Sequence, residues 1–176
     1  YALFTNKGMF KITLGSSFKQ LGQTFVAMRF SSLTIVLVLG LAYIMNFSGQ
    51  TISIGQFLAS TGAVFALLSP MLGWVGTAVT GSDTSANALF SSLQYEAAQS
   101  NASLAHVTPD LFLASNTMGG VIGKMISPQS LAIAAVTTGE TESNLFKKVI
   151  PWSIGMLAVL CVLVFLQSHA LSFILP

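Results

Sequence analysis

SSLTIVLVLGLAYIMNF, residues 31–47, is a run of apolar and small residues long enough to cross a bilayer as a helix. It lies within a longer stretch, from Phe30 to Ser82, that contains no Asp, Glu, Lys, Arg or His. A charge at the bilayer centre costs about 2.5–3.5 kcal/mol even on a lenient insertion scale, so hydrocarbon demands such gaps. This stretch therefore predicts an integral membrane protein.

The composition agrees with that prediction. Only 7% of the 176 residues are charged, and the mean hydropathy is +0.76. Soluble domains carry about 25% charged residues, which keep them dispersed. The net charge of +2 forms no dense basic patch with interleaved aromatics, so we expect no nucleic-acid partner.

The pattern of charges and apolar runs divides the chain into two parts. Residues 1–29 carry four basic and no acidic side chains, and they predict a cytoplasmic loop followed by a helix start. Residues 30–176 are predicted to form an all-α membrane domain. Its expected elements are a span over 31–47, a re-entrant hairpin over 54–98, a broken helix over 109–139 and a span over 149–170.

The hairpin prediction rests on a polar interruption between two apolar stretches. Residues 54–79 are rich in small side chains, and TGSDTSAN, residues 80–87, is expected to break the helix. The following segment, Ala86–Ala98, reaches only about 20 Å as a helix, too short for a crossing. Two full spans would place the later loops on the same sides, so the charge pattern is compatible with either arrangement.

The broken helix is predicted from one charge and two pairs of helix-disrupting residues. Between Leu111 and Gly139 the only charged residue is Lys124, near the middle. Breaks are expected at Gly119-Gly120 and at Ser127-Pro128, where Pro also fits the first position of a new helix. With residues 1–29 in the cytoplasm, Lys147 and Lys148 then fall on the same side, as the positive-inside rule requires.

The two polar interruptions are the candidate substrate site. Helix N-termini inside a membrane present free N–H groups and a positive dipole end to anions, and Ser, Thr and Asn add polar contacts. For the two asparagines the alternative is plain helix–helix hydrogen bonding. The candidate substrate-binding residues are Ser82, Thr84, Asn87, Asn116, Thr117, Gly119, Gly120 and Lys124.

A lysine in mid-membrane must find a partner. Lys124 is expected either to meet a substrate carboxylate, to pair with Asp83, or to reach toward an interface. Asp83 is the candidate for proton coupling, with capping of the following helix as its alternative role. Ser82, Thr84 and Ser85 are equally able to cap that helix.

Nothing in the residues predicts catalysis or a bound cofactor. No nucleophile stands with a base, and no Cys–His cluster predicts a metal site. Cys161 is the single cysteine and lies in an apolar run, so a packing role is expected. We therefore expect neither an enzyme nor a metal or cofactor, with a proton, or alternatively sodium, as coupling ion.

Two motifs carry a family resemblance. GSDTSANALF, residues 81–90, and NTMGGVIGKMISPQS, residues 116–130, resemble the bacterial L-lactate permease family. LAIAAV and TGETESNLFKK, which follow, and the final apolar run are also similar to it. The resemblance covers the chain from Arg29 onward, and the first 28 residues match more loosely. Proteins of this family are several times longer, so the chain resembles their last part.

The resemblance implies a function and an architecture. It implies uptake of lactate, and in some members glycolate, with protons across the bacterial inner membrane by a multi-pass protein. It also implies two inverted repeats, each with a re-entrant hairpin and a broken helix, of which this chain would be one half. Its partners would be the N-terminal half of the same protein, the lipid bilayer and a small carboxylate.

Two other functions remain open from the sequence. A sodium-coupled dicarboxylate carrier is the first, although one intramembrane lysine favours a monocarboxylate. A non-transporting membrane subunit is the second, and it would make both polar interruptions structural. The leading hypothesis is proton-coupled transport of a small 2-hydroxy monocarboxylate.

Overall fold

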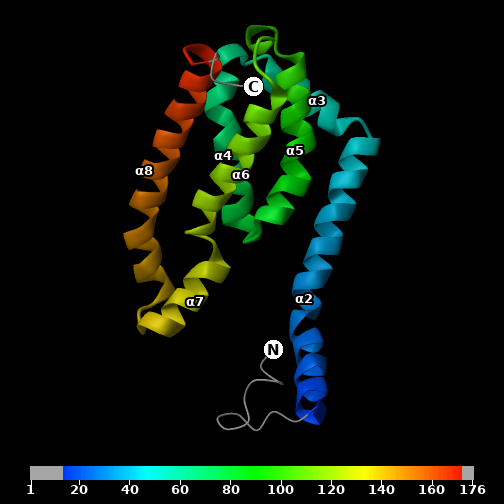
Figure 1. Cartoon of the computed structure of the whole chain (residues 1–176), viewed down its shortest axis with the longest axis vertical. Coiled ribbons are helices and arrows are strands. Elements are labelled where there is room, and N and C mark those ends of the chain that lie inside the picture. The colour runs from blue at the N-terminus through cyan, green and yellow to red at the C-terminus, as the bar shows by residue number, and fades with distance from the viewer. Residues whose placement is uncertain (1–13, 172–176) are drawn as a thin grey trace. The chain divides into compact units, whose positions relative to one another are not determined.

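The structure is a computed structural model that describes residues 14–171. It divides into two units, Tyr1–Leu37 and Val38–Pro176, which are described separately below. The described residues form helices and connecting turns, and no strand occurs among them. The elements, drawn in Figure 1, are α2 (Leu14–Phe47), α3 (Gln50–Ala59), η1 (Gly62–Val64), α4 (Phe65–Thr80), α5 (Asp83–Ser100), η2 (Ala102–Leu104), α6 (Pro109–Lys124), α7 (Pro128–Thr138) and α8 (Glu142–His169).

Within the first unit, the described residues belong to α2. The prediction for residues 1–29 was a loop followed by a helix start, and residues 14–29 are helical. Residues 1–13 of that prediction lie outside the described residues. The apolar run 31–47 continues a helix that has already begun because nothing between residues 14 and 31 disrupts it.

The second unit begins within α2, which ends at Phe47, the residue where the sequence placed the end of the span. Gly49 follows with a φ of 76°, a left-handed backbone that glycine adopts without steric strain. The segments Ile35–Phe47 and Gln50–Ala59 meet there at an angle of 76°. The bend marks the start of the second apolar segment, as the polar residues at this point predict.

The segment expected to be continuous over residues 54–79 contains a second interruption. α3 ends at Ala59, and the short turn of η1 precedes α4. Gly62 has a φ of 60°, and its carbonyl oxygen accepts a hydrogen bond of 2.8 Å from the Asn101 side chain. The loop after α5 therefore stabilises a turn that the sequence around Ser60 did not predict.

α4 and α6 form the centre of the second unit, with α5 on one side and α8 on the other (Figure 1). Phe65 and Phe112 pack together at one end, with ring centroids 5.1 Å apart. Closer to the middle, the two backbones touch through glycines. A Cβ added at Gly119 would overlap the carbonyl oxygen of Pro70, and one at Gly123 would overlap that of Trp74.

This packing corrects the break predicted at Gly119-Gly120. α6 runs without interruption from Pro109 to Lys124, through both glycines. The glycines serve close contact with α4, as small residues commonly do between membrane helices. The second predicted break is confirmed, because α6 ends at Lys124 and α7 starts with Ser127 as its cap and Pro128 as its first residue.

The last helix begins earlier than the sequence predicted. The predicted elements end at residue 139 and resume at residue 149, which leaves the charged residues 140–148 as a connecting loop. In the structure α8 starts at Glu142, with Thr141 accepting a hydrogen bond from Asn144 N at 3.3 Å. The helix continues to His169 and includes the predicted span over residues 149–170 almost entirely. Cys161 is buried in it beside Ile122 and Leu157, as its predicted packing role requires.

Two described helical segments, Gly62–Thr80 and Glu142–His169, are long and apolar enough to cross a membrane. A third crossing results if the bent pair, Ile35–Phe47 with Gln50–Ala59, forms one span. The expectation of an all-helical membrane protein is confirmed. The length of Gly62–Thr80 permits a full crossing as well as the predicted re-entrance of the hairpin.

A candidate substrate and proton site at the α4–α5 turn

The turn between α4 and α5 consists of only Gly81 and Ser82. Gly81 has a φ of 70° and ends α4, with its N–H donating to the Thr77 carbonyl at 2.8 Å. Ser82 caps α5, since its hydroxyl accepts a hydrogen bond of 3.3 Å from Ser85 N. The predicted polar interruption is confirmed but shorter than expected, because Asp83 already belongs to the first turn of α5.

A chain of side-chain hydrogen bonds leads from the middle of α4 to Asp83. The Ser69 hydroxyl donates to Gln94 Oε1, and Gln94 Nε2 donates to Asn116 Oδ1 at 2.6 Å. Asn116 Nδ2 then donates to Asn87 Oδ1 at 2.6 Å, and Asn87 Nδ2 donates to Asp83 Oδ2 at 3.3 Å. The chain passes from α4 to α5, across to α6 and back to α5, so it joins the three helices.

The members of this hydrogen-bonded chain that lie farthest from the turn are fully buried. Ser69, Gln94 and Asn116 are 0% exposed. An unpaired polar group in such a position costs about 1–3 kcal/mol, so each hydrogen bond matters for packing. A fully paired buried network also favours a single arrangement of the three helices, since a displaced helix would leave its members unpaired.

Two polar atoms beside this chain have no partner. Among the buried side-chain atoms of the described residues, Thr77 Oγ1 and Asp83 Oδ1 make no hydrogen bond. Both lie against Gly120 of α6: a Cβ there would stand 2.8 Å from Thr77 Oγ1 and would overlap Asp83 Oδ1. Glycine at position 120 thus allows the carboxylate to reach the helix backbone.

Lys124 lies at the end of α6 and reaches the same turn. Its ammonium donates to the carbonyl oxygen of Gly81, and the side chain is half-buried. The cation therefore lies at the C-terminal ends of both α4 and α6, where the helix dipole favours positive charge. The alternative of an ion pair with Asp83 is not what the structure shows, since the Lys124 ammonium donates to a backbone carbonyl instead.

Most of the predicted site residues come together here. Asp83, Asn87 and Asn116 belong to the hydrogen-bonded chain, and the Thr117 hydroxyl donates to Asn87 Oδ1 at 3.2 Å. Ser82 lies in the turn, Lys124 donates to the carbonyl of its neighbour Gly81, and Gly119 and Gly120 form the contact surface of α6. Thr84 differs, because it lies exposed in the first turn of α5. The roles of these residues in binding stay predictions.

Sequence reasoning missed Ser69, Thr77 and Gln94. Each is a polar side chain in a helix and is fully buried in the structure. Ser69 and Thr77 stand in an otherwise apolar helix, which was a usable signal, since buried membrane polar groups find partners. Gln94 lies among other polar residues, SSLQYEAAQS, so nothing in the sequence singled it out.

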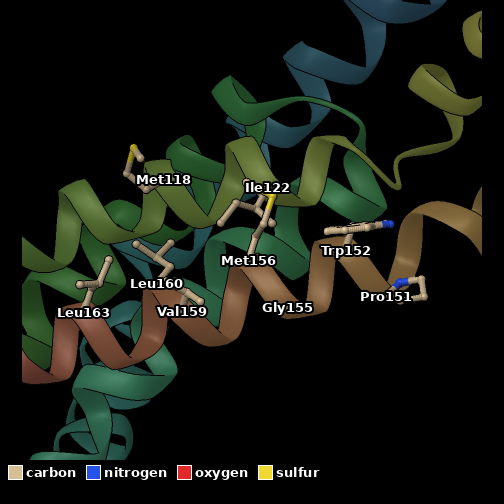
Figure 2. A pocket seen from close by; sticks show the side chains of 9 residues that line it. All are labelled: Met118, Ile122, Pro151, Trp152, Gly155, Met156, Val159, Leu160 and Leu163. Atoms are coloured by element: carbon tan, nitrogen blue, oxygen red, sulfur yellow. The ribbon is translucent and has the colours of Figure 1, made fainter.

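A second surface of the unit is apolar. A groove of about 670 Å³ runs between α6 and α8 (Figure 2). Its lining consists of Met118, Ile122, Pro151, Trp152, Gly155, Met156, Val159, Leu160 and Leu163. The residues that line this groove include no charged side chain to compensate a carboxylate, so the polar turn is the candidate site.

Comparison with known proteins gives a consistent result. The family described as L-lactate permease matches residues 2–171. An L-lactate permease of Bacillus subtilis (strain 168) is 44% identical over 164 residues, which are 92% of this chain and 28% of that protein. No solved structure matches the chain.

Two proteins of Escherichia coli (strain K12) are also similar. An L-lactate permease is 42% identical over 93% of this chain and 28% of its own length. Glycolate permease GlcA is 41% identical over 85% of this chain and 26% of its own length. The chain thus spans less than a third of each relative it matches, and these relatives are transporters by name rather than enzymes. The motifs around Asp83 and Lys124, the helical membrane fold and the match over almost the whole chain together show that this chain belongs to the L-lactate permease family.

Proposed function

We propose that this chain is the C-terminal part of a longer, multi-pass secondary transporter of the bacterial inner membrane. It would carry L-lactate or a related small 2-hydroxy monocarboxylate together with protons. The names of the relatives support the substrate class, and their greater length supports the larger protein. The observation that carries the proposal is the position of Lys124. Its ammonium is held at the α4–α5 turn, and Lys124 is the only charged residue between Leu111 and Gly139 in the sequence.

Lys124 is suited to exchange its hydrogen-bond acceptor for a substrate carboxylate. Its ammonium now donates to a neutral carbonyl oxygen, that of Gly81. A carboxylate is a stronger acceptor for an ammonium than a neutral carbonyl oxygen, because opposite charges attract. A substrate carboxylate would therefore displace the carbonyl, and Ser82 in the turn, with the exposed Thr84 in the first turn of α5, would complete its contacts.

The single lysine also bears on the charge of the substrate. At the turn itself, α4, α5 and α6 contribute Lys124 and Asp83, whereas Glu96 of α5 and Asp110 of α6 lie towards the opposite ends of their helices. A monocarboxylate matches the lysine, and a proton matches Asp83. A dicarboxylate with sodium as coupling ion would require a further cation beside the turn.

The architecture supports alternating access in the larger protein. The α4–α5 hairpin and the break between α6 and α7 place helix ends side by side, as transporters built from inverted repeats do. Under this proposal the present unit is one repeat, and the rest of the protein supplies the other repeat. The substrate would bind where the two repeats face each other.

The test uses the complete permease that carries this sequence, reconstituted in liposomes. Labelled L-lactate uptake is driven by an imposed proton gradient, and Lys124→Ala is compared with Lys148→Ala. Lys148 is the control because it is exposed and pairs with Glu140 outside the site. We expect proton-driven uptake to fall at least about tenfold in Lys124→Ala, since loss of a charged hydrogen bond costs about 1.5–3 kcal/mol, and to persist in Lys148→Ala.

Several outcomes would contradict the proposal. Uptake that survives Lys124→Ala would remove the lysine from the site while leaving the transporter. Uptake that follows a sodium gradient instead would favour the sodium-coupled carrier. Absence of uptake by correctly inserted wild-type protein would exclude lactate and favour a non-transporting subunit.

A further inference from the structure

The side chain of Gln129, from α7, packs against the α4–α5 turn. A Cβ added at Gly81 would stand 2.9 Å from Gln129 Cδ, 3.1 Å from its Oε1 and 3.2 Å from its Cγ, and these are the three nearest atoms. Glycine at position 81 therefore leaves room for the amide over the turn. Gln129 is exposed, and its amide forms no hydrogen bond within the part of the chain that the structure describes. Its donors and its acceptor are thus available to a ligand.

Lys124 reaches the same glycine from another helix, since its ammonium donates to the Gly81 carbonyl oxygen. Lys124 is the last residue of α6 and Gln129 is the second of α7, with only Met125–Ser127 and Pro128 between them. In one continuous helix, two residues five positions apart would point about 140° away from each other. The break between α6 and α7 is what brings the ammonium and the amide to the same turn.

One hydroxyl fixes the backbone of this break. Ser127 Oγ donates to the Lys124 carbonyl oxygen at 3.0 Å and accepts from Ser130 N at 3.4 Å, and Ser127 is 0% exposed. Pro128 follows as the first residue of α7, where its fixed φ suits a helix. The backbone at Gln129 is therefore held in place relative to Lys124, while the glutamine side chain keeps its rotational freedom.

The two side chains suit different groups of a 2-hydroxy acid. An ammonium only donates hydrogen bonds, and a carboxylate only accepts them. An amide both donates and accepts, as an alcohol hydroxyl does, so the two can pair in either direction. The hydroxyl of such an acid lies on the carbon next to the carboxylate, and Lys124 and Gln129 likewise converge on one residue, Gly81. By contrast, the Ser82 hydroxyl already accepts from Ser85 N at 3.3 Å.

We propose that Gln129 binds the 2-hydroxyl group of the substrate and selects 2-hydroxy acids over acids that lack this group. The inference rests on the proposed function, in which Lys124 binds the carboxylate, and it adds the residue that sets specificity. A site that pairs a substrate hydroxyl disfavours the analogue without it, because the partner in the protein loses its hydrogen bond. Water can reach the exposed Gln129, so the discrimination is that of one neutral hydrogen bond, roughly three- to tenfold.

The experiment uses the complete permease in liposomes and a trace of labelled L-lactate. Unlabelled L-lactate and propionate, which has the carboxylate without the 2-hydroxyl, compete with the label. In Gln129→Leu we expect the lactate concentration for half-inhibition to rise about three- to tenfold, because one hydrogen bond is lost. The propionate concentration for half-inhibition should not change. Because Gln129 is exposed, this variant should fold as the wild type does.

Gln99→Leu is the matched control. Gln99 is also an exposed glutamine, but it lies in the last turn of α5 and donates to the Tyr95 hydroxyl of its own helix at 2.8 Å. It should keep both half-inhibition values. Lys124→Ala, in contrast, should weaken both acids, since each carries a carboxylate. Unchanged values in Gln129→Leu, or equal weakening of both acids, would overturn the role of Gln129 in hydroxyl recognition.

Gln129→Glu gives a second test with almost the same shape. A carboxylate at this position would pair with the Lys124 ammonium and compete with every acid, so lactate uptake should fall at least about tenfold. An acidic residue in the first turn of a helix is favourable, so the fold should persist. Wild-type uptake in this variant would mean that the two side chains do not meet at the substrate, and would overturn the inference. Absence of lactate uptake by the inserted wild type would contradict the proposed function itself, whereas unchanged selectivity of an active Gln129→Leu variant would contradict the inference alone.

Discussion

α6 has two faces of opposite character. On one face Asn116, Gly119 and Gly120 are buried against α4 and α5. On the other, Met118 and Val121 are 53% and 56% exposed, beside the apolar groove shared with α8. In a membrane, apolar side chains gain little by leaving lipid, so helix contacts come from small residues and paired polar groups. The comparison therefore places the specific interactions, and the candidate site, on the polar face.

The largest effect is expected when a glycine on the polar face of α6 is compared with a glycine in the apolar groove. Gly119→Ala would push a methyl into the Pro70 carbonyl and should lower folding stability by about 3 kcal/mol, at the upper end of overpacking effects. Gly155→Ala, on α8 in the groove, meets nothing within 4 Å and should be neutral or slightly stabilising. Thermal unfolding in detergent measures both variants. Equal losses of stability would mean that the faces do not differ in packing.

A second test compares neighbouring polar and apolar positions of α6. Asn116→Leu removes the centre of the hydrogen-bonded chain, so Gln94 and Asn87 each lose one hydrogen bond. We expect a loss of about 1–3 kcal/mol, about 0.5–1.5 kcal/mol for each of the two hydrogen bonds, together with loss of lactate uptake. Met118→Leu, on the exposed face, is the control and should change neither quantity. Retained stability in Asn116→Leu would show that the network contributes little to packing.

The smallest effect is expected where polar groups face water. The Lys148 side chain donates to Glu140 at 3.1 Å and, with a hydrogen bond from Asn144, holds the pKa of Glu140 below its usual value. A lowered pKa in the folded state stabilises the protein above the unfolded pKa of Glu, and this contribution disappears as the pH falls through the folded value.

The measurement is the unfolding temperature of wild type and Lys148→Gln between neutral and acidic pH. We expect a small advantage of the wild type near neutral pH that vanishes in acid, because exposed ion pairs contribute little. High salt should reduce the same difference. An advantage that grows in acid would contradict this assignment of Glu140.

Helix ends with local signals could be predicted from the sequence. Phe47 precedes Ser48 and Gly49, and Ser127-Pro128 supplies both a cap and a first helical residue. These signals act within one turn of helix, so no partner helix is needed to interpret them. The start of α8 at Glu142 was missed although Thr141 is a capping residue, because the surrounding charges were taken to indicate a loop.

Gly119-Gly120 was misinterpreted for a different reason. Glycine weakens a helix, but it also allows two helices to approach closely, and the pair Gly119-Gly120 is compatible with both roles. The decision depends on whether Pro70 and Trp74 of another helix stand opposite, which is a long-range property. Ser69 and Gln94 pose the same difficulty, since their partners lie on different helices.

The sequence by itself determined that this protein enters a membrane, because transfer of its apolar runs to hydrocarbon depends on composition alone. It also determined the family, the polar turn before Asp83 and the isolated charge of Lys124. Only the tertiary structure decided that Lys124 contacts the Gly81 carbonyl and that Asp83 Oδ1 is buried against Gly120 without a hydrogen-bond partner. Those contacts depend on how closely α4, α5 and α6 approach, and that distance is set by side chains far apart in the chain.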